Sequence, residues 1–570
     1  MYPATTFIRF ACSLALALSV LVPGVSAANQ AGEEHSRVIL QFATAADRDA
    51  AFARILDGGG AVRVSDTEAG PALVALGSTA LLNTVAGLAT QMSPDAGVSI
   101  TAIRRSAPRE GAPARGNWVS RSRERDATAV DRPRSGFSVA IIDSGIQPHP
   151  DLPLSRIRAF EDFVDGSPTP VDGCGHGTHV AGIIAGNGRS SNGIYAGIAP
   201  TVDIVALRVL GDDCSGNTSD VIDALEWIGR HHDLYRIKVV NLSLGHAVLE
   251  PIFTDPLVQA VERLARKGVT VVTAAGNRGV NPATGRPGYG GAGVPCNAPS
   301  AICVGALDTH GSIPLDDDRV TDTSARGPTR FDLLSKPDLV APGVNVVSLS
   351  ARGSRLFTEF QDNHVAGASG EPQYFVLSGT SMASPLVAAA AALLLQTNGA
   401  LSTNALKLAL QFTARPVART DVLTQGAGAL NIPGAVLFAG AIDPAAQHGS
   451  NWIRHRLTAA NVDAFGQFIA WGQRIIYGDR YMHPDYAQMH LLRWDDDIVW
   501  AYDAIADNIV WGNSGDDIVW GPRDADFAWW GQHDDNIVWG NADDDNIVWG
   551  NGELRVEWTA DTIEGFWWSK

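Results

Sequence analysis

The chain has 570 residues, of which 45% are hydrophobic and 18% are charged. This length predicts about three or four domains, and the hydrophobic fraction excludes a largely disordered chain. The formal net charge of −18 argues against nucleic acid or an anionic membrane surface as a partner, because both are negatively charged.

The first 27 residues have the features of a secretory signal peptide. Arg9 precedes an apolar run over residues 10–22, and Val25 and Ala27 supply the small residues of a cleavage site. The alternative is a membrane anchor, but the run is shorter than the roughly 20 residues that a membrane span needs. We therefore expect residues 1–27 to be removed, and the protein to be secreted or extracellular, or held at the cell surface, without a membrane span.

The five cysteines fit an exported protein, because Cys12 leaves with the signal peptide and four remain. Four cysteines can pair in three ways in an oxidising compartment. The short spacing favours a bond between Cys296 and Cys303, which leaves Cys174 with Cys214. Buried free thiols are the alternative. No C-x-x-C motif or Cys/His cluster indicates a zinc site.

Residues 37–105 alternate predicted strands and helices and form a small α/β unit. Residues 106–135 are rich in Arg, Ser, Pro and Gly, which predicts an exposed linker that is open to proteolysis. Within the small unit, strands are predicted at residues 38–42, 72–76 and 98–103, and helices at residues 45–56 and 78–88.

Residues 136–440 alternate short β-branched runs with Ala-rich helical stretches, which predicts a mostly parallel sheet covered by helices. Two polar residues follow predicted strands of this sheet: Asp143 after residues 138–142, and Asn277 after residues 271–273. Functional groups collect at the carboxyl ends of parallel strands, although simple turn residues are also common there.

Histidine and serine candidates lie among small residues at the start of predicted helices. His176 and His179 belong to Gly-His-Gly-Thr-His-Val-Ala-Gly, and Ser381 belongs to Gly-Thr-Ser-Met-Ala-Ser-Pro. The two histidines could be metal ligands, but no third ligand is apparent, and either could be a core histidine. Ser381 could be a simple helix N-cap, but it also stands at the positive end of the helix dipole.

Asp143, His176 and Ser381 follow the chain order Asp, His, Ser, with Asn277 between the last two. Residues 136–440 resemble the subtilisin-like (subtilase) serine proteases in three signature blocks. The matching segments are Val139-Ala140-Ile141-Ile142-Asp143-Ser144-Gly145, His176-Gly177-Thr178-His179-Val180-Ala181-Gly182 and Ser378-Gly379-Thr380-Ser381-Met382-Ala383-Ser384-Pro385.

This resemblance implies a role for each candidate. Ser381 would attack the scissile carbonyl, His176 rather than His179 would act as base and acid, and Asp143 would orient the imidazole. The Asn277 side chain and the Ser381 backbone N–H would bind the oxyanion. The chemistry would need no cofactor, and no metal ligand is assigned.

The resemblance also implies a cleft that binds an extended peptide by β-augmentation. Residues 243–245 and 274–276 would form the two walls of the primary pocket, and a glycine at position 293 would leave room for a large apolar or aromatic side chain. Ordinary strand and turn packing is the alternative. The pocket residues would be Ser243, Leu244, Gly245, Ala274, Ala275, Gly276 and Gly293.

By placement and pattern, residues 37–105 resemble the family's inhibitory propeptide. This implies assisted folding, occupation of the cleft and self-cleavage within residues 105–125, whereas the alternative is a permanent N-terminal domain. Residues 186–194 stand where many subtilases carry a calcium loop. They include no carboxylate, so a plain polar loop competes with a structural calcium site.

Residues 494–551 repeat a unit typified by Asp-Asn-Ile-Val-Trp-Gly, and residues 494–550 hold 14 Asp against one Arg. One unit cannot bury its own tryptophan, so the units must stack, as a short β-solenoid or a stack of hairpins. Calcium binding by the Asp pairs and surface binding by exposed tryptophans are alternatives. Residues 441–493 give no clear signal, and residues 552–570 form a C-terminal tail.

We therefore predict an α/β fold with a mostly parallel, doubly wound, subtilisin-like sheet, a small α+β propeptide domain and a short β-repeat region. The predicted function is that of a secreted serine endopeptidase that processes itself from a precursor. Its partners would be protein or peptide substrates and its own propeptide. The alternative is a surface-binding or adhesive protein in which the repeats carry the main function.

Overall fold

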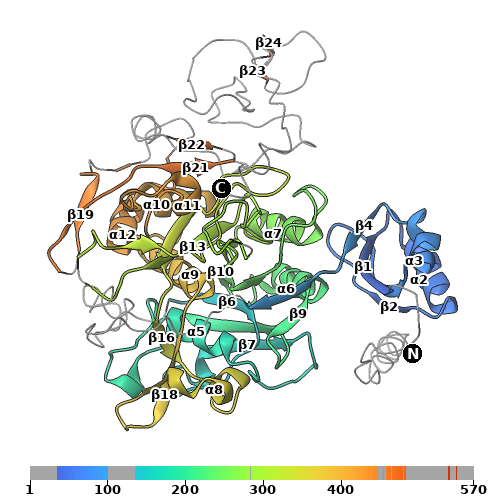
Figure 1. The fold of residues 1–570 in the computed structure, drawn as a ribbon, viewed down its shortest axis with the longest axis horizontal. Coiled ribbons are helices and arrows are strands. Elements are labelled where there is room, and N and C mark those ends of the chain that lie inside the picture. The colour runs from blue at the N-terminus through green and yellow to red at the C-terminus, as the bar shows by residue number, and fades with distance from the viewer. Residues whose placement is uncertain are drawn as a thin grey trace, which may run out of the picture.

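The computed structural model describes residues 35–100, 135–282, 284–312, 314–446, 453–454, 457–463, 465–478, 480–482, 537–538 and 547–548 (Figure 1). The predicted signal peptide, nearly all of the linker, most of the repeats and the C-terminal tail lie outside the described residues.

The N-terminal unit is a four-stranded antiparallel sheet in the order β2-β3-β1-β4, with two helices packed on it. The side chains of Thr44 and Ser78 cap the two helices by accepting backbone N–H groups of their first turns. The two predicted helices and the first two predicted strands are present, whereas β2 and β4 were not predicted. The elements are β1 (His35–Gln41), α2 (Ala45–Asp57), β2 (Ala61–Val64), β3 (Ala72–Ser78), α3 (Thr79–Ala86) and β4 (Gln91–Pro94).

The larger unit is built on an eight-stranded sheet in the order β14-β13-β12-β10-β6-β8-β7, with β15 also paired to β13. All neighbours are parallel except β13 and β14. This confirms the predicted α/β class. The strands are β6 (Ser138–Asp143), β7 (Ile157–Asp162), β8 (Asp203–Arg208), β10 (Ile237–Leu242), β12 (Thr270–Ala274), β13 (Ile302–Asp308), β14 (Arg319–Val320) and β15 (Leu339–Pro342).

Helices cover both faces of this sheet, because its central strands are apolar on both sides. On β6, Val139 and Ile141 join the core shared with α5 and α9, whereas Ala140 and Ile142 join the core shared with α6 and α7. The helices are α5 (His176–Ala185), α6 (Thr218–His231), α7 (Pro256–Arg266), α8 (Arg355–Glu359), α9 (Thr380–Thr397), α10 (Thr403–Phe412), α11 (Val422–Gln425) and α12 (Ile432–Ala441).

Helix α9 is long and apolar enough to cross a membrane by composition alone, but nearly all of its residues are buried within the protein. It packs on α5, α12 and the sheet strands β10, β12 and β13. We therefore assign it as the core helix of this unit, with Ser381 in its first turn.

Short strands complete the described fold. The pair β23–β24 lies in two successive repeats and is parallel, which is the pairing of a solenoid and not of a hairpin. The strands are β5 (Gly97–Ile100), β9 (Ser215–Asn217), β11 (Leu244–Gly245), β16 (Val346–Leu349), β17 (His364–Ala366), β18 (Pro372–Leu377), β19 (Ala460–Val462), β20 (Phe468–Ala470), β21 (Ile475–Tyr477), β22 (Arg480–Met482), β23 (Ile537–Val538) and β24 (Ile547–Val548). Single 3-10 turns lie at Leu154–Arg156, Arg189–Ser191 and Gln361–Asn363.

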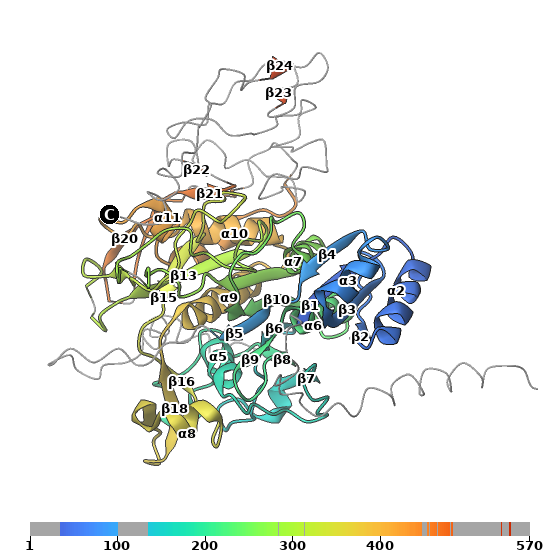
Figure 2. The same ribbon diagram turned by 45° about the vertical axis from the view of Figure 1, so that its right-hand side comes forward.

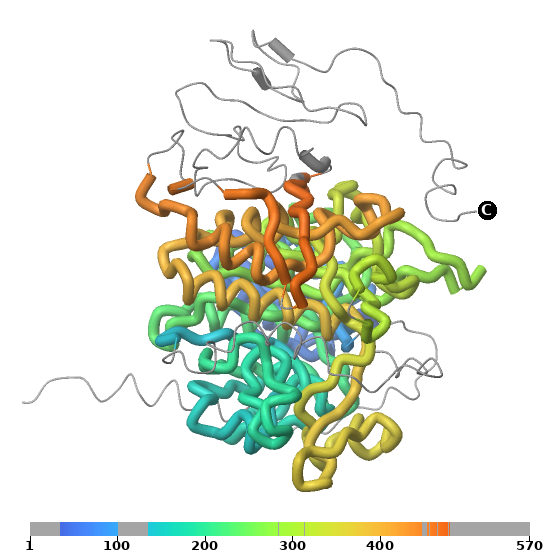
Figure 3. Tube along the Cα trace, turned by 90° about the vertical axis from the view of Figure 1, so that its left-hand side faces the viewer, coloured from blue at the N-terminus to red at the C-terminus, as the bar shows by residue number. Residues whose placement is uncertain are grey.

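The segment with β19 to β21, which showed no clear signal in the sequence, packs on α10 and α12 (Figure 3). Trp471 is buried against Phe412 and Phe438, with ring centroids 6.3 and 6.1 Å away, and its indole N–H donates to Asn461. The Gly472 N–H donates to the Ala414 carbonyl at 2.7 Å. The folded unit therefore continues past residue 440.

Candidate active site

Asp143 and His176 form a buried pair at the carboxyl end of the central strand β6. The His176 Nδ1–H donates to Asp143 Oδ1 at 2.7 Å, and both side chains are fully buried. The same carboxylate oxygen also accepts the Ser144 backbone N–H. His176 Nε2 has no hydrogen-bond partner among the described residues. The pair therefore fixes one ring nitrogen and leaves the other available to accept a proton.

Glycines allow the loop that carries His176 to approach β6 closely. Gly145 has a φ of 108°, a left-handed value that favours glycine. A Cβ on Gly177 would lie 2.1 Å from the Gly145 carbonyl oxygen, so no larger residue fits there. The residues next to His176 are therefore small because larger side chains would collide with the backbone after β6.

Asp172 forms hydrogen bonds with the first turn of α5 and the residue before it. Its carboxylate accepts hydrogen bonds from the backbone N–H groups of Gly175 and Thr178 and from the hydroxyls of Thr178 and Ser144. The Ser144 hydroxyl in turn accepts the Gly177 N–H. Burial raises the pKa of the Asp172 carboxyl, and the Thr178 bonds oppose this shift most strongly. Asp172 is therefore a positioning residue for His176.

His179 is a core residue, as the alternative interpretation of the His pair allowed. Its Nε2–H lies 3.0 Å from the Phe375 carbonyl oxygen and 3.2 Å from that of Val346. Burial, with a smaller contribution from His176, lowers its pKa to about 3, so it is neutral. The described residues contain no group of three His, Cys, Asp or Glu side chains that could hold a metal ion.

Ser381 is joined to this end of the sheet through the residue that follows β10. Strands β10 and β6 pair in parallel with Leu242 opposite Ile142, so Ser243 and Asp143 are the residues that follow this pair on the two strands. The Ser381 hydroxyl donates to the Ser243 carbonyl at 2.9 Å, and the Ser243 hydroxyl donates to the Ser381 carbonyl at 2.9 Å. The Ser381 hydroxyl thus points at Ser243 and not at His176 Nε2. Catalytic hydrogen bonds in substrate-free sites are often unformed in this way.

Asn277 is held with its amide N–H₂ group available. Its Oδ1 accepts the Thr380 backbone N–H at 3.1 Å and the Thr380 hydroxyl at 3.2 Å, whereas its buried Nδ2 has no partner among the described residues. The Thr380 hydroxyl also accepts the Gly276 N–H. A fixed, unpaired donor beside a nucleophile is the arrangement of an oxyanion hole.

The walls predicted for the primary pocket lie next to one another. The Gly293 N–H donates to the Ala275 carbonyl, and the next residue, Val294, pairs with His246 through two backbone bonds. A Cβ on Gly293 would lie 2.5 Å from the His246 carbonyl oxygen. Ser243, Leu244 and Ala275 are buried behind this surface.

A strand of the N-terminal unit lies along the predicted substrate edge (Figure 2). The strand β5 pairs antiparallel with β11 on one side and with β9 on the other, and the pairing sets Leu244 opposite Ile100 and Gly245 opposite Ser99. The Ile100 N–H donates to the Cys214 carbonyl at 3.3 Å. The predicted last strand of this unit therefore forms a three-stranded sheet with two short strands of the other unit.

Both predicted disulfides are formed, Cys174–Cys214 and Cys296–Cys303. The second packs with Ala275 and Ala292 behind the pocket wall.

The expected calcium loop at residues 186–194 is closed by protein groups. The buried Asp151 carboxylate faces it and accepts the Ser190 N–H at 2.7 Å and the Tyr374 hydroxyl at 2.5 Å. Calcium sites usually need carboxylate oxygens that are available to the ion. The residues of this loop therefore do not fit a calcium ion.

The sequence did not identify Asp172 and Thr380 as functional residues. Thr380 directly precedes Ser381, and Asp172 precedes the glycine-rich loop of His176. Their positions next to the signature residues were the one indication of a functional role in the sequence. Only the folded chain shows which groups form hydrogen bonds with their side-chain oxygens.

Comparisons with known proteins show the family of the larger unit. Residues 134–435 match the subtilase family, Peptidase_S8. The serine protease AprX of Bacillus subtilis is 39% identical over 307 residues, which is 53% of this chain and 66% of AprX. Subtilisin Savinase of Lederbergia lenta is 36% identical over 301 residues, 53% of this chain and 91% of Savinase.

Among solved structures, fervidolysin from Fervidobacterium pennivorans, a keratinolytic enzyme related to subtilisin, has a similar fold. The TM-score is 0.56 at 19% identity, and the match covers 74% of this chain and 63% of fervidolysin.

Proposed function

The chain belongs to the subtilase family of serine proteases, and from this premise we propose that it is a secreted endopeptidase, made as a precursor, that cleaves proteins through Asp143, His176 and Ser381. The observation that carries the proposal is the buried 2.7 Å Asp143–His176 pair, whose Nε2 has no hydrogen-bond partner among the described residues. The Ser381 hydroxyl is held on Ser243, which follows the strand next to that of Asp143.

In the proposed reaction, the Ser381 hydroxyl turns from Ser243 toward His176 and attacks the scissile carbonyl. His176 Nε2 takes the hydroxyl proton and later gives it to the leaving amine, while Asp143 stabilises the imidazolium. Asn277 Nδ2 and the Ser381 N–H, in the first turn of α9, donate to the oxyanion. Water then repeats the cycle on the acyl-enzyme and releases the acid product.

The same site supports self-processing. Because β5 runs antiparallel to β11, the chain leaves Ile100 in the direction of Ser243, whose carbonyl oxygen lies 2.9 Å from Ser381 Oγ. We place the first cut at the peptide bond between Thr101 and Ala102, and any later trimming in the predicted window at residues 105–125.

The N-terminal unit is also suited to remain as an inhibitor. Asp95 accepts the backbone N–H and hydroxyl of Ser219 at the start of α6, where a carboxylate is favoured by the helix dipole. Arg63 pairs with Asp220 and Asp223 on the same helix. These contacts and β5 would keep the cleaved propeptide over the cleft.

The proposal is tested by purifying the secreted wild-type protein and a Ser381→Ala variant and sequencing their N-termini. We expect wild-type protein that begins at or after Ala102, and a variant that begins at Ala28 with the propeptide attached. Identical cutting of both proteins would mean that another protease does the processing.

A further inference from the structure

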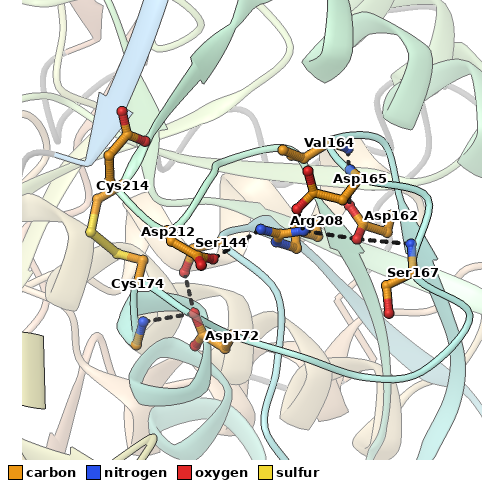
Figure 4. A network of polar contacts seen from close by, with 12 residues as sticks. Ser144, Asp162, Val164, Asp165, Ser167, Asp172, Cys174, Arg208, Asp212 and Cys214 are labelled. Carbon is orange, nitrogen blue, oxygen red and sulfur yellow. Dashed lines mark hydrogen bonds and ion pairs between the residues drawn. A yellow bond between two sulfur atoms is a disulfide. The ribbon is translucent and has the colours of Figure 1, made fainter. Parts of the chain in front are cut away.

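The disulfide between Cys174 and Cys214 joins two parts of the active site that are 40 residues apart in sequence (Figure 4). Cys174 lies two residues before His176, and Cys214 immediately precedes β9. Both cysteines are buried. The bond therefore links the loop of the catalytic base to one edge of the substrate cleft.

The strand β9 has little support from other strands. It has three residues, and the one strand paired with it among the described residues is β5 of the N-terminal unit. Within the peptidase unit, an isolated bridge joins its Gly216 to Leu210, and the Gly211 N–H donates to the Ser215 carbonyl. Cys214 also has a φ of 68°, which is unfavourable for a residue with a Cβ. When the propeptide leaves after cleavage, β9 keeps only the short bridge to Leu210, so its position relative to His176 depends on contacts between the turn at residues 210–214 and the loop before His176.

One such contact is an ion-pair network around Arg208. Its buried guanidinium donates to Asp162 at 2.8 Å, to Asp165 at 2.7 Å and to Asp212 at 3.0 Å (Figure 4). The Asp212 carboxylate lies over Gly173, where a Cβ would be 1.9 Å from its Oδ1. The turn before Cys214 is therefore packed directly on the turn before Cys174.

Helix α8 adds a second contact. The Arg355 N–H donates to the Gly173 carbonyl at 2.7 Å, and its guanidinium donates to the Asp213 carbonyl at 3.1 Å. The Arg355 side chain is 46% exposed and the Asp212 side chain is 74% exposed, so water weakens both contacts. The disulfide is buried and covalent, and it is the strongest connection between the two turns.

Resting on the proposed function, we propose that Cys174 and Cys214 are positioning residues, whose disulfide holds β9 in register with His176 so that the mature enzyme can bind extended peptides. A short substrate reaches only Ser381, Asn277 and the pocket walls at residues 243–245 and 274–276. A longer peptide must also pair with β9, as β5 does. Without the disulfide, β9 must be ordered again each time a long peptide binds.

The experiment compares a Cys174→Ser/Cys214→Ser variant with a Cys296→Ser/Cys303→Ser control on two substrates. The long substrate is the p-nitroanilide of Gly-Val-Ser-Ile-Phe, which carries the sequence of β5, and the short one is the p-nitrophenyl ester of acetyl-Phe. Rates are normalised to the amount of active enzyme, titrated with a serine-directed phosphonate. We expect the KM for the long substrate to rise about ten- to hundredfold in the first variant, because ordering even one or two residues costs this much.

We expect the KM for the short ester to stay within about twofold of wild type, and the control variant to keep the wild-type ratio between long and short substrates. If the ratio of the KM for the long substrate to the KM for the short ester is the same in the first variant as in wild type, the inference is overturned. If that variant does not fold, mature wild-type enzyme is reduced with dithiothreitol and alkylated, and mass spectrometry identifies the alkylated cysteines. The same ratio of KM values in the alkylated enzyme then tests the inference. A wild-type enzyme that is not labelled by the phosphonate would instead refute the proposed function.

Discussion

At the scale of single residues, the proposed oxyanion site depends on a contact that only the folded chain shows. Thr380 donates two hydrogen bonds to Asn277 Oδ1, and the buried Asn277 Nδ2 has no partner among the described residues. Thr380 would thus act through Asn277, without touching the substrate.

We expect Asn277→Ala to lower kcat by about 10²–10³, with little change in KM, because an oxyanion donor acts mainly in the transition state. Thr380→Val should lower kcat by about tenfold in the wild-type background, because one bond that orients Asn277 is lost. In the Asn277→Ala background, Thr380→Val should lower kcat by no more than about twofold, because the bond that the Thr380 hydroxyl accepts from the Gly276 N–H is the one left to lose. Additive losses in steady-state kinetics would show that Thr380 does not act through Asn277.

A second residue-scale feature is a buried group of three side chains, in which the amino groups of Lys336 and Lys407 both contact the Asp338 carboxylate. Burial lowers the pKa of Lys407 from its ordinary value of 10.5 to about 7, although Asp338 opposes the shift. Between pH 7 and 10.5 the unfolded chain therefore binds a proton that the folded chain lacks, and stability should rise with pH.

We expect the free energy of unfolding of an inactive Ser381→Ala protein to rise by up to about 1.4 kcal/mol per pH unit between pH 7.5 and 9.5. Urea denaturation at each pH measures this slope. Lys407→Met should remove it, whereas the exposed Lys238→Met should keep it. An equal slope in the Lys407→Met protein would assign the pH dependence to another group.

At the scale of elements, the segment with β19 to β21 is part of the peptidase core. It brings Trp471 into the space between α10 and α12 and returns backbone bonds to Ala414 and Phe412. Its packing explains why the described fold extends past residue 435, where the family match ends.

We expect Trp471→Ala to lower the free energy of unfolding by about 3–5 kcal/mol, as for other buried aromatic residues. The control is Phe468→Ala, whose side chain is 72% exposed and should change stability by no more than about 0.5 kcal/mol. Thermal unfolding of the Ser381→Ala background measures both. Similar losses in the two variants would contradict the assignment of this segment to the core.

The sequence predicted the elements and residues whose reasons are local. The strands that precede Asp143 and Asn277 are continuous runs of buried residues. The glycines around His176 are required by close backbone contacts, and they form a motif that can be recognised in the sequence. The strands β2 and β4 were missed because they are short and largely exposed, so they carry no hydrophobic pattern.

Features that depend on distant contacts could not be predicted in this way. The placement of β5 between β9 and β11 is set by pairing across two units, and the burial of Trp471 is set by helices that lie about 30 to 60 residues earlier in the chain. Neither segment has a local pattern that names its partner.

At the scale of the whole molecule, the N-terminal unit and the peptidase unit share the sheet β11-β5-β9 and a polar interface on α6. If this interface is what keeps the cleaved propeptide bound, weakening it should hasten the appearance of activity.

We expect Asp95→Ala to shorten the lag before casein turnover by about tenfold when the precursor is allowed to mature, because the loss of charge-assisted bonds to Ser219 weakens the inhibitor. The control is Asp57→Ala, an exposed residue at the end of α2. Continuous casein hydrolysis after refolding measures the lag. Equal lags for wild type and Asp95→Ala would show that Asp95 does not hold the propeptide.

The acidic repeats are expected to be separable from the peptidase. A chain that ends at residue 482 should keep wild-type kcat/KM on soluble casein, because the described core is complete by β22. Loss of surface adsorption in the same protein would give the repeats an accessory binding role. Circular dichroism measures folding of this protein and immunoblotting measures its secretion. A loss of either would show that the repeats have a structural role instead.

The most direct measurement is covalent labelling of the mature wild-type protein with a serine-directed phosphonate, followed by peptide mass spectrometry. The three side chains Asp143, His176 and Ser381 predict a single adduct on Ser381, with loss of casein hydrolysis in proportion to labelling, and no adduct in a His176→Ala variant. Casein hydrolysis that survives complete labelling of Ser381, or a mature protein that is never labelled there, would contradict the account.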